Sequence, residues 1–165
     1  MVNGARDGLD AEAELSIDTG FDITRSDIRE IVSDEGLHAV WPVVAQLRDH
    51  LDEAGFVAQA RRQFAEGWHA VGLFQDEAPR AFAGWRVQEM LAHGRMLYVD
   101  DLVTDAHARS GGHGKALLDW LKTEARRQGC RKLELDSGTQ RHGAHAFYLR
   151  ERMRISAHHF SIDLD

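Results

Sequence analysis

The chain has 165 residues, of which 43% are hydrophobic and 28% are charged, and these proportions predict one ordinary globular domain with a buried core. Its 27 acidic and 20 basic side chains give a formal charge of −7, which argues against a protein that tracks nucleic-acid phosphates and favours either a cationic partner or simply a well-solvated surface. The single cysteine, Cys130, excludes a disulfide framework, and the lack of a long apolar run or of a leader-like pattern in residues 1–20 predicts a cytoplasmic protein without a membrane segment.

The first predicted elements are a tail and two helices. Residues 1–26 carry six acidic side chains and few large apolar ones, so we expect an acidic N-terminal tail that is flexible or loosely docked. Apolar residues at three- and four-residue steps predict a helix over residues 37–51, with Pro42 in its first turn. A second, shorter amphipathic helix is predicted to begin after the N-cap Asp52 and to end at Gly67.

The spacing of the apolar residues then changes from one typical of a helix to one typical of strands. Three segments rich in aromatic and branched residues, joined by short turn-like segments, predict an antiparallel meander. Its strands are expected at residues 68–74, 80–91 and 96–104. The remaining pattern predicts a mixed α/β domain over residues 27–165. Its later elements are expected to be a helix over 114–128 that stops at Gly129, a strand over 131–136, a helix over 144–153 and a closing strand over 155–164.

The turn before the helix at residues 114–128 carries three glycines, Gly111, Gly112 and Gly114. A helix start has unpaired amides and a positive dipole end, and missing Cβ atoms let a phosphate approach closely, so this turn is suited to a phosphate-bearing ligand. Arg109 and Lys115 add positive charge beside it. The nucleotide P-loop and the dinucleotide fingerprint both fail at positions that they require. Taken alone, the turn leaves open some other phosphate ligand or no ligand.

The hexapeptide Arg-Ser-Gly-Gly-His-Gly, from Arg109 to Gly114, resembles the R/Q-x-x-G-x-G/A motif of the GNAT superfamily of N-acetyltransferases. The preceding strand, residues 97–103, resembles the fourth strand of the small-amine and polyamine branch, and residues 144–148 are similar to the family's A-x-x-F/L-Y helix. The resemblance spans about residues 28–165. It implies a GNAT-like, mixed but mostly antiparallel central sheet flanked by helices, with strands 4 and 5 splayed apart around acetyl-CoA.

The same resemblance implies which residues bind and react. The backbone of Leu102, Val103 and Thr104 would pair with the pantetheine arm, and the Val103 amide would polarise the thioester carbonyl. Tyr148 aligns with the general acid that protonates the departing thiolate, although its pattern also fits a core aromatic residue. The pyrophosphate would be held at the turn by Arg109, Ser110, Gly111, Gly112, His113, Gly114 and Lys115.

Asp100 stands where small-amine members often place a catalytic or water-ordering Glu, and it is our choice for the path of the amine proton, with Asp101 as the rival. Strand alternation sends these two side chains to opposite faces, so only one lines the cleft unless a bulge breaks the alternation. Because Asp is shorter than Glu, a bridging water is favoured over direct contact. The pattern around either aspartate is equally typical of an ordinary surface carboxylate or an ion pair in a hairpin. Arg141 departs from the family pattern, which often has Asn there, and residues 153–155 lack the usual Gly-Phe.

We therefore expect an acetyl-CoA-dependent N-acetyltransferase that moves an acetyl group to a primary amine by direct attack in a ternary complex. The acceptor would be a small-molecule or peptide amine. The alternatives are a non-catalytic acyl-CoA-binding or regulatory module, and an acyltransferase with another acyl donor or acceptor. The histidines form no H-E-x-x-H, and His158 and His159 point to opposite faces of the predicted strand, so we expect no metal. We expect no nucleic-acid or membrane partner, and the resemblance is compatible with a homodimer.

Overall fold

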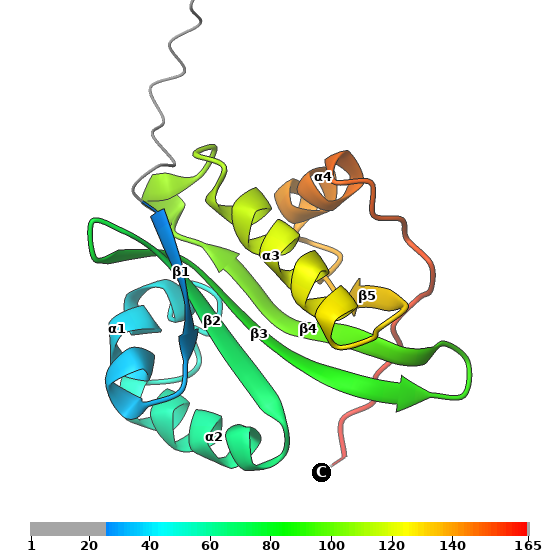
Figure 1. Cartoon of the computed structure of the whole chain (residues 1–165), viewed down its shortest axis with the longest axis horizontal. Helices are drawn as coiled ribbons and strands as arrows, with labels where there is room; N and C mark the ends of the chain where they lie inside the picture. The colour runs from blue at the N-terminus through cyan, green and yellow to red at the C-terminus, as the bar shows by residue number, and fades with distance from the viewer. Residues whose placement is uncertain (1–25, 165) are drawn as a thin grey trace, which may run out of the picture.

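The computed structural model describes residues 26–164, so the predicted acidic tail lies outside the described residues except for Ser26. The described chain forms a five-stranded sheet with helices on both sides (Figure 1). None of its helices is long and apolar enough to cross a membrane. In chain order the elements are β1 (Ser26–Ile31), α1 (Asp34–Val44), α2 (Glu53–Ala65), β2 (Trp68–Gln75), β3 (Ala78–Met90), β4 (Gly94–Thr104), the short 3-10 helix η2 (Ala106–Ala108), α3 (His113–Arg127), β5 (Lys132–Leu135) and α4 (His142–Arg150).

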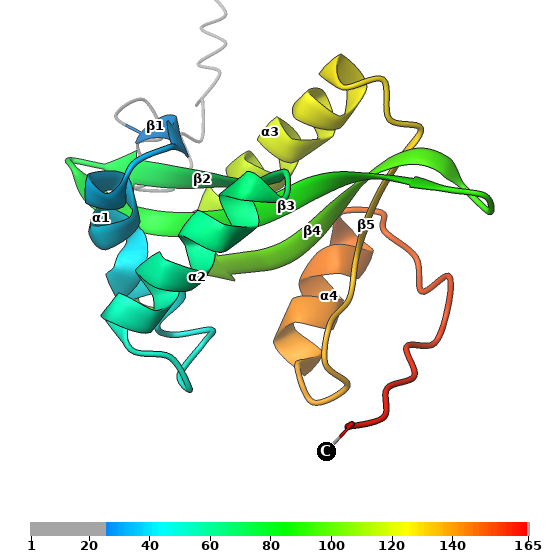
Figure 2. The ribbon, with the colours of Figure 1, turned by 90° about the horizontal axis from the view of Figure 1, so that it is seen from below.

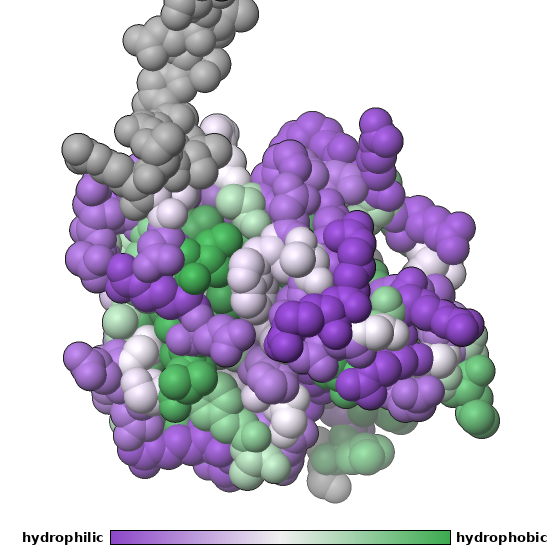
Figure 3. Space-filling view, viewed as in Figure 1, coloured by the Kyte–Doolittle hydropathy of each residue, from purple (hydrophilic) through white to green (hydrophobic). Residues whose placement is uncertain are grey.

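The sheet has the order β1-β2-β3-β4-β5, and only the last pair is parallel. The predicted antiparallel meander is therefore confirmed as β2, β3 and β4. Figure 2 shows α3 on one side of the sheet and α1, α2 and α4 on the other. Alternation along the strands builds a core on each side, because neighbours such as Ala70 and Val71 point to opposite faces. Hydrophilic residues cover much of the outer surface around α3 (Figure 3).

The signals predicted to start and stop helices are largely confirmed. Asp52 Oδ1 accepts a hydrogen bond from the Gly55 amide at 2.7 Å and so caps α2. Gly67 and Gly129 follow α2 and α3 with φ of 82° and 70°, the left-handed region in which glycine carries no steric penalty.

The prediction that Pro42 lies in the first turn of its helix is wrong, because α1 begins earlier and Pro42 lies near its end. The Ser33 side chain accepts a hydrogen bond from the Gly36 amide at 3.2 Å and fixes the start before the apolar pattern begins. β1 was not predicted, since Ser26–Ile31 is a short and largely polar segment. Its strand conformation comes from pairing with β2.

The predicted closing strand over residues 155–164 is also wrong, because this C-terminal segment is irregular in the structure. Its alternating apolar side chains are exposed, with Ile155 at 77% and Phe160 at 90%. Alternation of residue types satisfies a strand pattern, but a strand also needs a partner edge, and in the described chain β5 pairs only with β4. The alternation therefore predicted a conformation that no hydrogen-bonded ladder supports here.

Candidate active site

Two pockets lie next to one another along β4. The acid pocket, of about 460 Å³, is lined by Asp100 and Asp101 of β4, by Asp136 and by the segment around α1 and α2. The loop pocket, of about 740 Å³, is lined by residues 102–104 of β4, by the glycine turn and by α4. Successive residues of one strand thus pass from the acid pocket into the loop pocket.

The loop pocket opens where β4 and β5 part. Their parallel ladder runs from Met96 to Val99 of β4 and stops there, whereas β4 continues to Thr104, still paired on its other edge with β3. The predicted splaying of strands 4 and 5 is therefore confirmed. Backbone groups at the end of β4 are left without the β5 ladder as a partner, so they are available to a ligand that lies along the strand.

The glycine turn leads directly into α3. Gly112 is the N-cap with a φ of 77°, and no side chain caps this helix start. The first helical hydrogen bond runs from the Ala116 amide to the Gly112 carbonyl at 2.9 Å, so the amides of the preceding turn point out of the helix end. A Cβ added to Gly114 would lie 2.9 Å from Thr104 Oγ1, which explains why the turn can pack this closely against β4. The turn is a backbone site for an anion.

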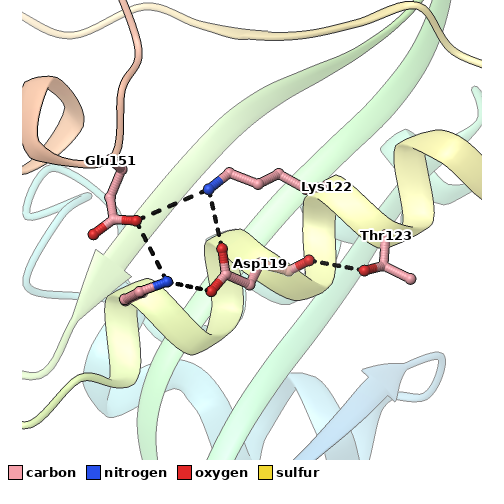
Figure 4. Close-up of polar contacts among 5 residues, drawn as sticks. Asp119, Lys122, Thr123 and Glu151 are labelled. Carbon is pink, nitrogen blue, oxygen red and sulfur yellow. Dashed lines mark hydrogen bonds and ion pairs between the residues drawn. The ribbon is translucent and has the colours of Figure 1, made fainter.

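The two cations of the turn differ in their surroundings. Lys115 Nζ lies 2.5 Å from Asp119 and 3.6 Å from Glu151, so its charge is already compensated. Lys122 contacts the same two carboxylates at 3.0 and 3.9 Å, and Figure 4 shows Glu151 reaching toward α3 from the end of α4. Arg109 lines the loop pocket, is exposed and forms no ion pair with the described residues. Of the two cations of the turn, Arg109 is therefore the one that remains free for a ligand.

Tyr148 lies on α4 and lines the loop pocket beside Phe147, whose ring centroid is 5.5 Å away. Burial raises the pKa of the Tyr148 phenol, and the nearby charge of Arg141 opposes this rise only in part. The phenol therefore stays protonated across the neutral and mildly alkaline range. Arg141 precedes α4 and lines the same pocket.

A β-bulge decides how the two acids of β4 are placed. Gly84 of β3 pairs with Asp101, whereas the next residue, Trp85, pairs with Val99, so Asp100 is the extra residue. Both carboxylates consequently line the acid pocket, which is the exception to strict alternation considered above. Sequence alone had no means of locating this bulge.

Each acid of β4 has a guanidinium partner. Arg86 Nε donates to Asp100 Oδ2 at 2.9 Å, and Arg48 Nε donates to Asp101 Oδ1 at 2.7 Å. Burial raises the pKa of the Asp101 carboxyl, and the attraction of Arg48 offsets only part of that rise. Asp101 thus binds a proton more tightly than an ordinary aspartate does.

Three further side chains of the acid pocket escaped the sequence interpretation: Arg48, Tyr98 and Asp136. Tyr98 Oη donates to Asp136 Oδ2 at 2.5 Å, and burial together with this bond raises the pKa of the phenol. Asp136 follows β5 and lies near the part of β4 that carries Asp100 and Asp101. Its position after the end of a neighbouring strand was the one feature of the sequence that could have pointed to it. Arg48 lies in a loop far from β4 in the sequence and carried no signal.

Two histidines near the loop pocket, His113 and His145, have structural contacts. Buried His113 places Nδ1 3.1 Å from the Ala108 carbonyl oxygen, and His145 places Nε2 3.0 Å from the Gly138 carbonyl oxygen. Across residues 26–164, no three His, Cys, Asp or Glu side chains gather in a group that could hold a metal ion.

Comparison with known proteins adds independent findings. Residues 28–152 match the Acetyltransferase (GNAT) family. The chain is 33% identical over 122 residues to the uncharacterized N-acetyltransferase YhdJ of Bacillus subtilis (strain 168), a match that covers 73% of this chain and 86% of the relative.

Two solved structures show the same fold. An acetyltransferase of Trypanosoma brucei superposes with a TM-score of 0.70 at 21% identity, over 84% of this chain and 99% of that one. The aminoglycoside N-acetyltransferase AAC(6')-Iy, solved in complex with CoA, superposes with a TM-score of 0.75 at 13% identity, over 84% of this chain and 94% of that one. At these identities the likeness concerns the arrangement of the elements.

Proposed function

Because the chain belongs to the GNAT acetyltransferase family and is an N-acetyltransferase, we propose that it moves an acetyl group from acetyl-CoA to a primary amine by direct attack in a ternary complex. The main support is the meeting of two chemically different pockets on successive residues of β4. One suits a phosphate-bearing thioester and the other suits a cation, and the reacting groups would meet between Asp101 and Leu102.

The acetyl-CoA would occupy the loop pocket. Amides from Ser110 to Lys115 would hold the pyrophosphate at the start of α3, where a favourable interaction with an anion is worth roughly 0.3 to 2 kcal/mol. Exposed Arg109 would add a charge-assisted contact. The backbone of Leu102, Val103 and Thr104 would pair with the pantetheine arm, and the Val103 amide would polarise the thioester carbonyl.

The amine would enter the acid pocket as a cation and must lose a proton before it attacks. For an amine like that of lysine, this costs about 4 to 5 kcal/mol near pH 7. The sequence favoured Asp100 for the proton path, but burial favours Asp101, because it raises the pKa of the Asp101 carboxyl above its ordinary value and so strengthens it as a base. Asp100, held by Arg86, would then add negative charge and order a water beside the amine.

Tyr148 would act on the leaving group. As the amine nitrogen bonds to the carbonyl carbon, the C–S bond breaks and the thiolate takes the phenol proton. The second proton that the nitrogen must lose to become an amide would then pass through water to the phenolate and restore the phenol. Proton transfer from an ordinary phenol to a thiolate is uphill by about 2 kcal/mol, so hydrogen bonding to the developing thiolate carries part of the effect. Burial of Tyr148 keeps the phenol protonated, but by raising its pKa it also makes complete proton transfer harder, so the hydrogen bond to the thiolate would carry the larger share of the effect.

The experiment is a thiol-release assay with acetyl-CoA against alkylamines, aminoglycosides, amino acids and N-terminal peptides, with mass spectrometry of the product. We expect thiol release that depends on the amine, one added acetyl group, and intersecting lines in two-substrate kinetics. Parallel lines would rule out direct attack in a ternary complex. Acetyl-CoA binding without thiol release across the panel would favour the non-catalytic module, and release only with another acyl donor or with alcohols would favour the third possibility.

A further inference from the structure

The start of α4 brings a cation to the loop pocket. Arg141 comes directly before α4 and lines this pocket together with Tyr148 of the same helix. Its amide donates to the Gly138 carbonyl oxygen at 2.9 Å, and its own carbonyl oxygen accepts from the His145 amide at 3.1 Å. These two bonds fix its backbone at the helix start. Arg141 is exposed and, within residues 26–164, takes part in no ion pair, so its charge is available to the pocket.

The geometry of α4 relates this cation to the phenol of Tyr148. Tyr148 follows Arg141 by seven residues, which is about two turns of an α-helix, so both residues lie on one face of α4. Side chains of a helix lean toward its N-terminus. We therefore expect the Tyr148 ring to lean back toward the start of α4, where Arg141 stands.

Other charged groups of the loop pocket stand elsewhere. Arg109 belongs to the glycine turn, and the charge of Lys115 is already compensated by two carboxylates. The other charged or titratable residues that line the pocket are His113, His142, Arg150 and Glu151. Within the described chain, the Arg141 guanidinium is the one charged group that shifts the pKa of the Tyr148 phenol, which it lowers against the larger effect of burial. Arg141 is thus the cation that acts on the proton donor.

The difficult step for Tyr148 is the one that creates negative charge beside it. When the C–S bond breaks, its electron pair stays on sulfur, and transfer of the phenol proton to the thiolate leaves a phenolate. Burial disfavours that phenolate. A nearby guanidinium stabilises negative charge on either atom, and acetyl-CoA that fills the pocket would displace water that otherwise screens this charge.

From this arrangement we propose that Arg141 assists Tyr148 by stabilising the negative charge that passes between the leaving sulfur and the phenol oxygen. This inference rests on the proposed function, because it concerns the leaving group of the same reaction. Arg141 is a positioning residue, which places positive charge beside the proton donor and keeps its own protons.

The test is a double-mutant cycle on kcat, with acetyl-CoA and an amine that supports thiol release. Arg141→Gln should lower kcat about tenfold in the wild-type background but less than about twofold in Tyr148→Phe, where no phenol proton is transferred. Arg141→Lys keeps the charge and should retain kcat within about threefold of the wild type. The Kd for acetyl-CoA should change by less than about twofold in these variants.

Arg154→Gln is the matched control, since it removes a guanidinium from an exposed position that lines neither pocket and should leave kcat unchanged. A titration of the phenol by ultraviolet absorbance gives a readout that needs no turnover. The chain has two tyrosines, so in Tyr98→Phe only Tyr148 titrates. Adding Arg141→Gln to that protein should move the titration to higher pH, because the guanidinium no longer opposes the effect of burial on the phenol pKa.

Several results would overturn the role of Arg141. One is an equal loss of kcat in the wild-type and Tyr148→Phe backgrounds, and another is an unchanged kcat in folded Arg141→Gln. A raised Kd for acetyl-CoA at unchanged kcat would mean that Arg141 binds the coenzyme instead, and a phenol titration that does not move would mean that the two groups do not interact. If no amine caused thiol release, the proposed function would fail, whereas the titration would still decide whether Arg141 acts on Tyr148.

Discussion

The loop pocket and the acid pocket share one strand but are built in different ways. Besides the side chains of α4, the loop pocket depends on backbone groups from a short stretch of sequence, from Leu102 to Lys115, in which Gly112 takes a φ of 77°. The acid pocket depends on side chains from separate elements, such as Arg48 and Asp136, that only the fold brings together. Backbone sites are sensitive to shape, whereas side-chain sites of this kind are sensitive to charge.

Tyr148→Phe is the strongest challenge to this contrast, because Tyr148 lines the loop pocket yet should act through its hydroxyl group. Loss of a general acid should lower kcat by about 100-fold while the affinity for acetyl-CoA stays nearly constant. Steady-state kinetics and a binding titration measure the two quantities. Unchanged turnover would remove Tyr148 from the mechanism.

Asp101→Asn removes one negative charge from the acid pocket and leaves the size of the side chain nearly unchanged, so it tests whether this pocket acts through charge. Asp101 must be ionised to accept a proton, and its raised pKa places the acidic limb of kcat above the ordinary range for aspartate. We expect kcat to fall roughly 30-fold, less than for many general bases because Asp100 and water remain nearby. Below the Asp101 pKa the wild type should lose its advantage over the variant.

This pH dependence is measured by pH profiles of kcat for the wild type and for Asp101→Asn. The fall of kcat at low pH should disappear in Asp101→Asn, whereas the ionisation of the amine itself should remain visible in both proteins. Asp100→Asn is the comparison variant. If that variant and not Asp101→Asn loses the limb, the base is Asp100, as the sequence first suggested.

Gly114→Ala adds one Cβ to the loop pocket and leaves its charge unchanged, so it tests whether this pocket depends on shape. The added Cβ would meet Thr104 Oγ1 at 2.9 Å and move the start of α3 away from β4. We expect the Kd for acetyl-CoA to rise about tenfold, with acceptor preference unchanged. The double variant Gly114→Ala, Thr104→Ala removes the opposing oxygen and should recover most of the affinity. Full affinity in the single variant would show that this close approach is not needed.

Glu151→Gln should have the smallest effect. It weakens contacts of 3.6 and 3.9 Å to Lys115 and Lys122 that join α4 to α3 (Figure 4). Because these contacts are long and the two lysines are partly exposed, although the Glu151 side chain is only 15% exposed, we expect the Tm to fall by about 2 °C and acceptor kinetics to stay unchanged. Calorimetric unfolding measures the first. A large change in acceptor preference would mean that α4 also shapes the acid pocket.

The same contrast explains what the sequence could predict of the fold. Helix ends marked by Asp52, Gly67 and Gly129 were predicted because a cap or a left-handed glycine is a local property. β1 was missed and residues 155–164 were wrongly assigned as a strand, because strand formation depends on a partner elsewhere in the chain. Pro42 misled the prediction since the cap at Ser33 outweighed it.

The candidate site divides along the same line. The glycine turn and Tyr148 were predicted from contiguous motifs, and the structure brings both to the loop pocket. The shared placement of Asp100 and Asp101 could not be chosen in advance, because it depends on the register between β3 and β4. Arg48 and its contact with Asp101 were missed, since no local pattern connects residues 53 positions apart.

The division of β4 between two pockets also has an evolutionary consequence. Phe56, Gln59 and Gln63 of α2 line the acid pocket and do not line the loop pocket. If the acid pocket receives the amine as proposed, substitutions in α2 can change the acceptor while the backbone of the loop pocket stays the same. β4 would then keep the two substrates aligned, so that one substrate could be exchanged without rebuilding the other site.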